Sequence, residues 1–169
     1  MSLLSLCSTE SSRWKEWLEA QGEVFFLYSR QQTRSDADAK DVFQEALVEA
    51  WQKTGDAIPD KALVFATIRR RAIDLGRSLD RRLKREQNVA ADREGWFVID
   101  YAEGDTRRYL RDALAVLPDP QREVLILRIW GDLSFPAIAN LTDVTVATAT
   151  SRYRYALEHL RGSLTELKP

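Results

Sequence analysis

The chain has 169 residues, of which 44% are hydrophobic, and its 25 Lys and Arg nearly balance 26 Asp and Glu, so the formal net charge is only −1. This length can bury one good-sized core or two small ones, and the near-neutral charge does not by itself indicate a nucleic-acid partner. The single cysteine excludes an intramolecular disulfide, and the single histidine makes a hydrolytic triad or a histidine-rich metal site improbable. The seven glycines are scattered and form no phosphate-binding loop. We therefore expect no enzyme, no metal and no cofactor.

The first 35 residues predict a helix rather than a targeting segment. The apolar start MSLLSLCS has no basic residue before Arg13, so it lacks the charged start of a signal peptide, and no run in the chain reaches the apolar length of a membrane span. We therefore expect a cytoplasmic protein with no membrane association. Large apolar side chains recur from Trp14 to Tyr28, which favours a first helix that packs on the second.

A second amphipathic helix is predicted over residues 36–51. Ser35 can cap it, with Asp38 three residues on as the capping-box partner. The side chains at helical spacing that should face a core are Ala39, Val42, Phe43, Ala46, Leu47 and Ala50. The opposite side carries Asp41, Gln44, Glu45, Val48 and Gln52. Taken alone, such a polar face is usually solvated helix surface.

Residues 61–85 form a strongly basic segment, with nine Lys and Arg against Asp74 and Asp80, a local balance of plus seven. Its apolar side chains are spaced as the buried stripe of one long helix, namely Phe65, Ile68, Ala72, Leu75, Leu79 and Leu83. Gly76 interrupts this helix at a cost of about 1 kcal/mol. The arginines would then point outward, where they could bind nucleic-acid phosphates; a solvated helix end, or general affinity for RNA or an acidic partner, is equally compatible with the pattern.

An acidic segment follows at residues 88–105 and has no clear helical period. One arginine, Arg93, stands there against five carboxylates, Asp92, Glu94, Asp100, Glu103 and Asp105. We interpret this segment as a linker between two domains, residues 1–87 and 106–169. The predicted fold is therefore all-α, with two small helical domains.

The C-terminal part contains three helical patterns with short turns between them. Asp119 can cap the first, with Pro120 at its first position, and Ser134 and Thr145 can cap the second and third. Asp143 falls where the chain must turn sharply. The buried stripe of the third helix would be Val146, Ala149, Tyr153, Ala156 and Leu160. This is a helix-turn-helix pattern, which can present its last helix to a DNA major groove, although plain helix packing produces similar patterns.

Five segments of the sequence together resemble a known family. LPDPQREVLILR, followed by LSFPAIA and VATATSRYRYALEHLR, resembles region 4 of sigma factors of the extracytoplasmic-function (ECF) type, the dissociable subunits that direct bacterial RNA polymerase to promoters. DADAKDVFQEALVEAW resembles region 2 of the family, and FATIRRRAIDLGRSLDRR its helix that melts and reads the −10 promoter element. The resemblance implies core RNA polymerase and promoter DNA as partners, and an anti-sigma factor as a further one.

The resemblance also implies roles for individual residues. Core polymerase, through its β′ coiled coil, would meet the polar face of the second helix at Asp41, Gln44 and Glu45. The −10 element would meet Arg69, Arg70, Arg71, Asp74 and Arg77. The upstream −35 element would meet Thr148, Thr150, Ser151, Arg152 and Arg154, while region 4 also contacts the β flap. The acidic linker would enter the catalytic cleft of polymerase, although a spacer kept soluble by its charge has the same composition.

Some positions depart from the family pattern. Leu63 replaces a common tryptophan, Asp60 an aromatic residue, Thr150 a frequent basic residue and Asp143 a glycine. With few basic residues on its last helix, region 4 alone should bind DNA poorly. Two other functions stay open at this point: an autonomous helix-turn-helix regulator, which would bind a palindromic site as a dimer, and a sigma-derived module that binds another protein without reading promoters.

Overall fold

A computed structural model of the chain describes residues 3–55, 57–86 and 112–165. Every element of regular secondary structure in these ranges is a helix, with no strand, which confirms the all-α prediction. The chain divides into two compact units, Met1–Glu94 and Gly95–Pro169, called the N-terminal and C-terminal units below. The predicted linker, residues 88–105, lies outside the described residues, so the exact domain limits stay a prediction.

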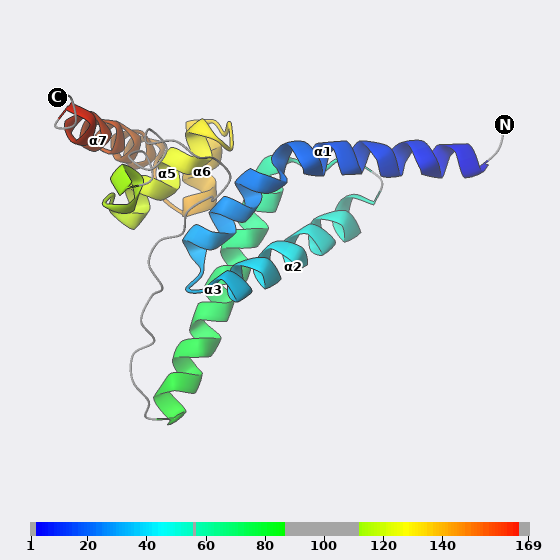
Figure 1. Cartoon of the computed structure of the whole chain (residues 1–169), viewed down its shortest axis with the longest axis horizontal. Helices are drawn as coiled ribbons and strands as arrows, with labels where there is room; N and C mark the ends of the chain where they lie inside the picture. The colour runs from blue at the N-terminus through cyan, green and yellow to red at the C-terminus, as the bar shows by residue number, and fades with distance from the viewer. Residues whose placement is uncertain (1–2, 56, 87–111, 166–169) are drawn as a thin grey trace. The chain divides into compact units, whose positions relative to one another are not determined.

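The N-terminal unit consists of α1 (Leu3–Gln32), α2 (Asp36–Thr54) and α3 (Lys61–Glu86), each of which packs on the other two (Figure 1). The predicted cap of α2 is confirmed, because the Ser35 hydroxyl accepts the backbone N–H of Asp38 at 3.1 Å. Gly55 ends α2 with a positive φ of 58°, a conformation that glycine adopts without strain. Asp60 then caps α3, since its carboxylate accepts the N–H of Ala62 at 2.9 Å.

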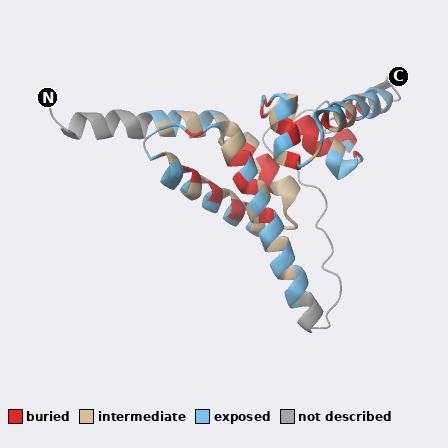
Figure 2. Ribbon diagram, turned by 180° about the vertical axis from the view of Figure 1, so that it is seen from behind, coloured by how far each residue is buried: buried red, intermediate tan, exposed pale blue. Residues whose placement is uncertain are grey.

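Aromatic rings from α1 and α3 form the centre of this unit. Phe25, Tyr28 and Phe65 are almost fully buried, and the ring of Phe65 lies 4.8 Å from that of Phe25 and 5.2 Å from that of Tyr28. The buried face of α2 consists mainly of small side chains, Ala39, Val42, Ala46 and Ala50, as Figure 2 shows in red. The small side chains let α2 approach its neighbours closely. Four of the six predicted core residues are therefore confirmed as buried, while Phe43 and Leu47 are half-buried.

The apolar stripe of α3 is buried only along its first half. Ile68 and Ala72 are buried, whereas Leu75 and Leu79 are half-buried, and the side chain of Leu83 lies outside the described set. Figure 1 shows the reason, because the second half of α3 extends beyond α1 and α2. The prediction of one long helix through Gly76 is confirmed.

The C-terminal unit contains α5 (Asp119–Ile129), α6 (Phe135–Thr142) and α7 (Val146–Thr165), preceded by a helical turn at residues 112–115. Helix α7 packs on both α5 and α6. The core of the unit gathers side chains from the turn, the following loop, α5 and α7, namely Ala113, Leu114, Leu117, Leu125, Ala156 and Leu160.

Two sequence predictions in this unit are wrong. Asp119 does not cap α5: the helix begins at Asp119 itself after Pro118, and its carboxylate instead pairs with the guanidinium of Arg122 at 2.9 Å. Val146 is not part of the buried stripe of α7, since it is 46% exposed at the first position of that helix. Of the other predicted stripe residues, Ala149, Ala156 and Leu160 are buried, while Tyr153 is half-buried.

None of the helices in the described ranges has an apolar stretch of the length and hydropathy that crossing a bilayer requires.

Candidate nucleic-acid and partner interfaces

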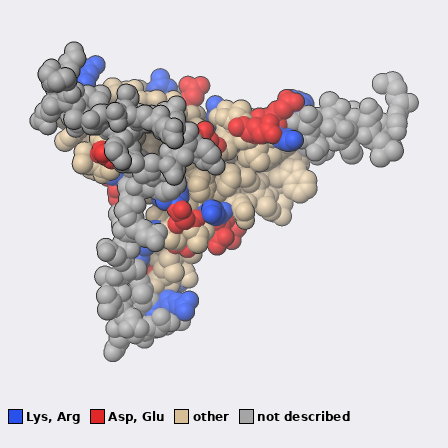
Figure 3. Space-filling model, in the orientation of Figure 1, with Lys and Arg blue, Asp and Glu red and all other residues tan. Residues whose placement is uncertain are grey.

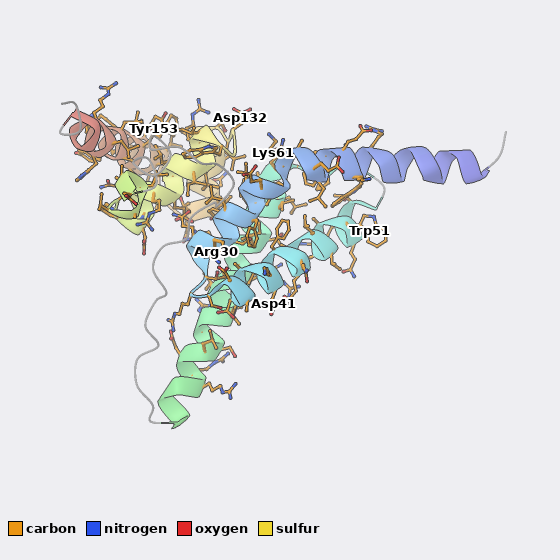
Figure 4. The ribbon with its side chains drawn as sticks, in the orientation of Figure 1. Arg30, Asp41, Trp51, Lys61, Asp132 and Tyr153 are labelled. Carbon is orange, nitrogen blue, oxygen red and sulfur yellow. The ribbon has the colours of Figure 1, made fainter. Side chains whose placement is uncertain are left out.

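The outer face of α2 carries the residues predicted to meet a protein partner. Asp41, Gln44 and Glu45 are all exposed, and Figure 4 shows Asp41 and Trp51 pointing away from α1 near opposite ends of the helix. Val48 and Trp51 add apolar area to this face, at 52% and 54% exposure. Sequence reasoning missed Trp51, although its spacing of three from Val48 places it on the same side of the helix. The face is therefore acidic at one end and apolar at the other.

Two of the arginines predicted to meet DNA form ion pairs with α2. The Arg70 guanidinium donates to one oxygen of the Glu49 carboxylate at 2.5 Å. Arg71 donates to the other oxygen of Glu49 from Nε and Nη2, at 3.2 and 3.0 Å, and to Glu45 from Nη1 at 3.0 Å. Acidic and basic atoms consequently lie intermingled over α2 and α3, as Figure 3 shows. The structure brings together residues that the sequence assigned to two different interfaces.

Glu49 is the centre of this cluster. Its pKa is lowered from 4.5 to about 2, chiefly because Lys53 donates to its carboxylate, with further lowering by Arg71 and Arg70 against the raising effect of burial. The side chain is 14% exposed, compared with 58% for Glu45. Glu49 is thus an anion at every physiological pH. Sequence reasoning missed this residue, because nothing local distinguishes it from any other glutamate on a helix surface.

The remaining residues predicted for the same interface lie at and beyond this cluster on α3. Asp74 and Arg77 are exposed, and Arg69 is half-buried. A further ion pair, between Arg34 and Asp80 at 2.8 Å, connects the loop before α2 to the second half of α3. In this pair α3 contributes the carboxylate, so the basic helix also binds a cation from elsewhere in its own unit.

In the C-terminal unit, the local geometry of the helix-turn-helix follows the sequence prediction closely. Ser134 caps α6 by accepting the N–H of Ala137 at 3.3 Å, and Thr145 caps α7 by accepting that of Thr148 at 3.1 Å. Asp143 lies between these helices in the left-handed conformation, with φ 57° and ψ 49°. These three predictions are confirmed, and together they set the sharp turn between α6 and α7.

The outer side of α7 is rich in hydroxyl groups but weakly charged. Thr150 and Arg154 are exposed, while Thr148, Ser151 and Arg152 are half-buried. The Thr150 hydroxyl donates to the carbonyl of Val146 at 2.8 Å, which leaves its acceptor lone pairs and its methyl group for a partner. Arg154 lies over the Tyr155 ring, 5.1 Å from its centre, and is 3.9 Å from Glu158. This surface can contact phosphates and base edges but attracts DNA only weakly by charge.

A buried arginine organises the segment that precedes the helix-turn-helix. The Arg122 guanidinium donates to the backbone carbonyls of Leu114, Ala115 and Leu117 at 2.8, 3.0 and 2.6 Å, and it pairs with Asp119. These carbonyls belong to the end of the helical turn and the loop after it; the carbonyl of Leu114 also accepts the backbone N–H of Leu117 at 3.3 Å. The sequence matched Arg122 to the family without assigning it this role.

No group of three or more His, Cys, Asp or Glu in the described part of the chain is arranged to hold a metal ion.

Comparisons with known proteins agree with these two helical units. Residues 107–160 match a family model described as Sigma-70, region 4. The chain is 30% identical to an RNA polymerase sigma-E factor of Streptomyces avermitilis, over 92% of this chain and 87% of that protein. It is 29% identical to the ECF RNA polymerase sigma factor SigL of Mycobacterium tuberculosis, over 95% and 93%. Its fold is similar to that of the sigma factor RpoE from Bartonella quintana, solved with the anti-sigma factor NepR, with a TM-score of 0.70, 21% identity, and coverage of 92% and 99%.

Proposed function

Since this chain belongs to the ECF family of RNA polymerase sigma factors, we propose how its surfaces divide the work of promoter-directed transcription initiation. Family membership makes core RNA polymerase and promoter DNA its partners. The observation that carries this conclusion is a similarity that extends over most of both chains, across both helical units. Like its relatives, the chain then supplies specificity while polymerase performs the chemistry, and it acts in the cytoplasm where bacterial polymerase works.

The first proposed surface is the outer face of α2, which we assign to the β′ coiled coil of polymerase. Asp41, Gln44 and Glu45 support this assignment because they are exposed along one side of the helix. Carboxylate and amide groups suit a basic partner surface and set the register of docking. Val48 and Trp51 extend the same face and add apolar area that a partner can bury.

The second proposed surface is the basic side of α3, which we assign to the −10 element. Its residues are Arg69, Arg70, Arg71, Asp74 and Arg77. Guanidinium groups displace phosphate counterions and can stack on unpaired bases, which suits a strand that has been separated from its complement. The support is the row of basic side chains along a single helix that extends beyond its neighbours.

The third proposed surface is α7 of the helix-turn-helix, which we assign to the −35 element. Thr148, Thr150, Ser151, Arg152 and Arg154 would contact phosphates and base edges in the major groove. Because the surface is weakly charged, we expect this unit to read DNA mainly when polymerase holds it in place, with the β flap as its second contact. An autonomous dimeric regulator is not favoured, since the relatives are sigma factors over nearly their whole length.

We also expect an anti-sigma factor as a regulatory partner. The support is a solved sigma factor of similar fold that was captured in such a complex.

In vitro transcription with bacterial core polymerase and a promoter library tests the proposal. The wild-type protein should yield run-off products that depend on its addition. D41A and E45A should reduce recovery of the protein with core polymerase, whereas E23Q, which changes an exposed carboxylate on α1, should not. A tight DNA complex without polymerase, together with no run-off product, would overturn the proposal.

A further inference from the structure

The guanidinium of Arg71 has each of its three nitrogens engaged by α2. Nε and Nη2 donate to Glu49, and Nη1 donates to Glu45. An arginine binds a carboxylate and a phosphate through the same planar fork, so the two anions compete for one set of N–H donors. While the glutamates hold Arg71, three of its five N–H donors are engaged, so only two remain for DNA.

The two glutamates differ in how easily a partner can reach them. Glu49 is 14% exposed and also holds Arg70 and Lys53, so it is the fixed member of the cluster. Glu45 is 58% exposed and lies on the same outer face as Asp41, the face assigned above to polymerase. A basic group on that partner could therefore take Glu45 away from Arg71 without disturbing the packing of α2 on α3.

We propose that these glutamates compete with DNA for Arg70 and Arg71, so that the free protein binds DNA through α3 more weakly than it does once polymerase has engaged Glu45. This inference rests on the proposed function, in which α2 meets polymerase and α3 meets DNA. Engagement of Glu45 by polymerase releases Nη1 of Arg71 and weakens the remaining contact with Glu49.

Thermodynamic linkage makes this competition reciprocal. If polymerase binding to α2 raises the affinity of α3 for DNA, then DNA bound to α3 raises the affinity of α2 for polymerase by the same factor. The free protein would consequently avoid unproductive binding to single-stranded nucleic acid, and the assembled complex would hold both partners more tightly.

The test measures how tightly the free full-length protein binds a fluorescent single-stranded oligonucleotide, using anisotropy at roughly 25 mM salt, where surface charges are weakly screened. E45Q and E49Q keep the shape of each side chain and remove its charge. Each should bind about fivefold more tightly than wild type, the size expected from losing one competing surface ion pair. E23Q removes an equal charge from α1 and should not bind more tightly.

A second set of variants separates competition from simple charge repulsion. In an R71A background, E45Q should produce no gain, because the arginine that Glu45 held is absent. An E45Q gain that persists in R71A would overturn the proposal, and so would unchanged or weaker binding by E45Q and E49Q, including binding too weak to detect in every variant. Run-off transcription by the wild-type protein, measured in parallel, reports on the proposed function separately, so failure of one is distinguishable from failure of the other.

Discussion

Two arginine sites in this protein, one in each unit, are built in opposite ways. In the N-terminal unit, Arg70 and Arg71 pair with glutamates across two helices at a surface that other molecules can reach. In the C-terminal unit, Arg122 is buried and is held largely by backbone carbonyls. Surface ion pairs contribute little stability and can be exchanged, whereas a buried and fully bonded arginine is costly to remove. We therefore expect Arg70 and Arg71 to serve in binding and Arg122 to serve in holding the fold.

The largest expected effect is loss of the buried arginine. R122A removes a donor from three carbonyls and should lower the free energy of unfolding of the C-terminal unit by about 3 kcal/mol. Urea unfolding followed by circular dichroism measures the loss, and hydrogen exchange of α5 and α7 amides assigns it to this unit. R122K keeps the charge but not the planar fork, so most of the loss should remain. An R122A protein as stable as wild type would contradict the architectural role.

The next effect concerns pH and the N-terminal unit. The pKa of Glu49 is about 2 in the folded protein and 4.5 ordinarily, so its ion pairs stabilise the fold above pH 4.5 and lose that effect as pH falls toward 2. Solvent screening limits the contribution to about 1 kcal/mol. E49Q should be less stable than wild type by this amount at pH 6, and the difference should shrink at pH values near 2. Urea unfolding at several pH values checks this, and a difference that is constant with pH would count against it.

Removing a helix cap in the C-terminal unit should lower the free energy of unfolding by a similar amount, but this loss should not depend on pH. T145A removes the hydroxyl that accepts the N–H of Thr148 and should cost about 1 kcal/mol. S134A, the matched change at the cap of α6, should cost a similar amount. Thermal unfolding of both variants gives the comparison. If neither variant is less stable than wild type, the tertiary packing alone sets the turn.

The smallest effect is a gain. Asp143 has a positive φ of 57°, a conformation that is strained for an L-residue but not for glycine. D143G should therefore stabilise the C-terminal unit by about 0.5 kcal/mol. Because Asp143 is exposed and lies outside α7, run-off transcription should stay close to wild type. In the described ranges one other non-glycine residue, Asp132, has a positive φ, so D132G is a matched control. A destabilised D143G protein would imply that the aspartate side chain stabilises the turn.

Prediction from sequence succeeded where interactions are short in range. The caps at Ser35, Ser134 and Thr145 each depend on a side chain and a backbone N–H three residues away, so local pattern was sufficient. It was wrong by one residue at the start of α5, because Arg122 three residues on competes for the Asp119 carboxylate. It was also wrong for Val146, whose helical spacing is right but whose position precedes the covered part of α7.

The amino-acid order therefore determined which segments form helices, the caps at Ser35, Ser134 and Thr145, and the family, while some helix ends lie several residues from their predicted limits, as at Thr54 of α2. Only the tertiary structure decided which charges face each other. The carboxylates that hold Arg71 lie 22 and 26 residues away in sequence, and they become neighbours because the alanine face of α2 lets that helix pack closely beside α3. Periodicity places a residue on one side of its own helix, but it contains no information about which side of another helix it will meet.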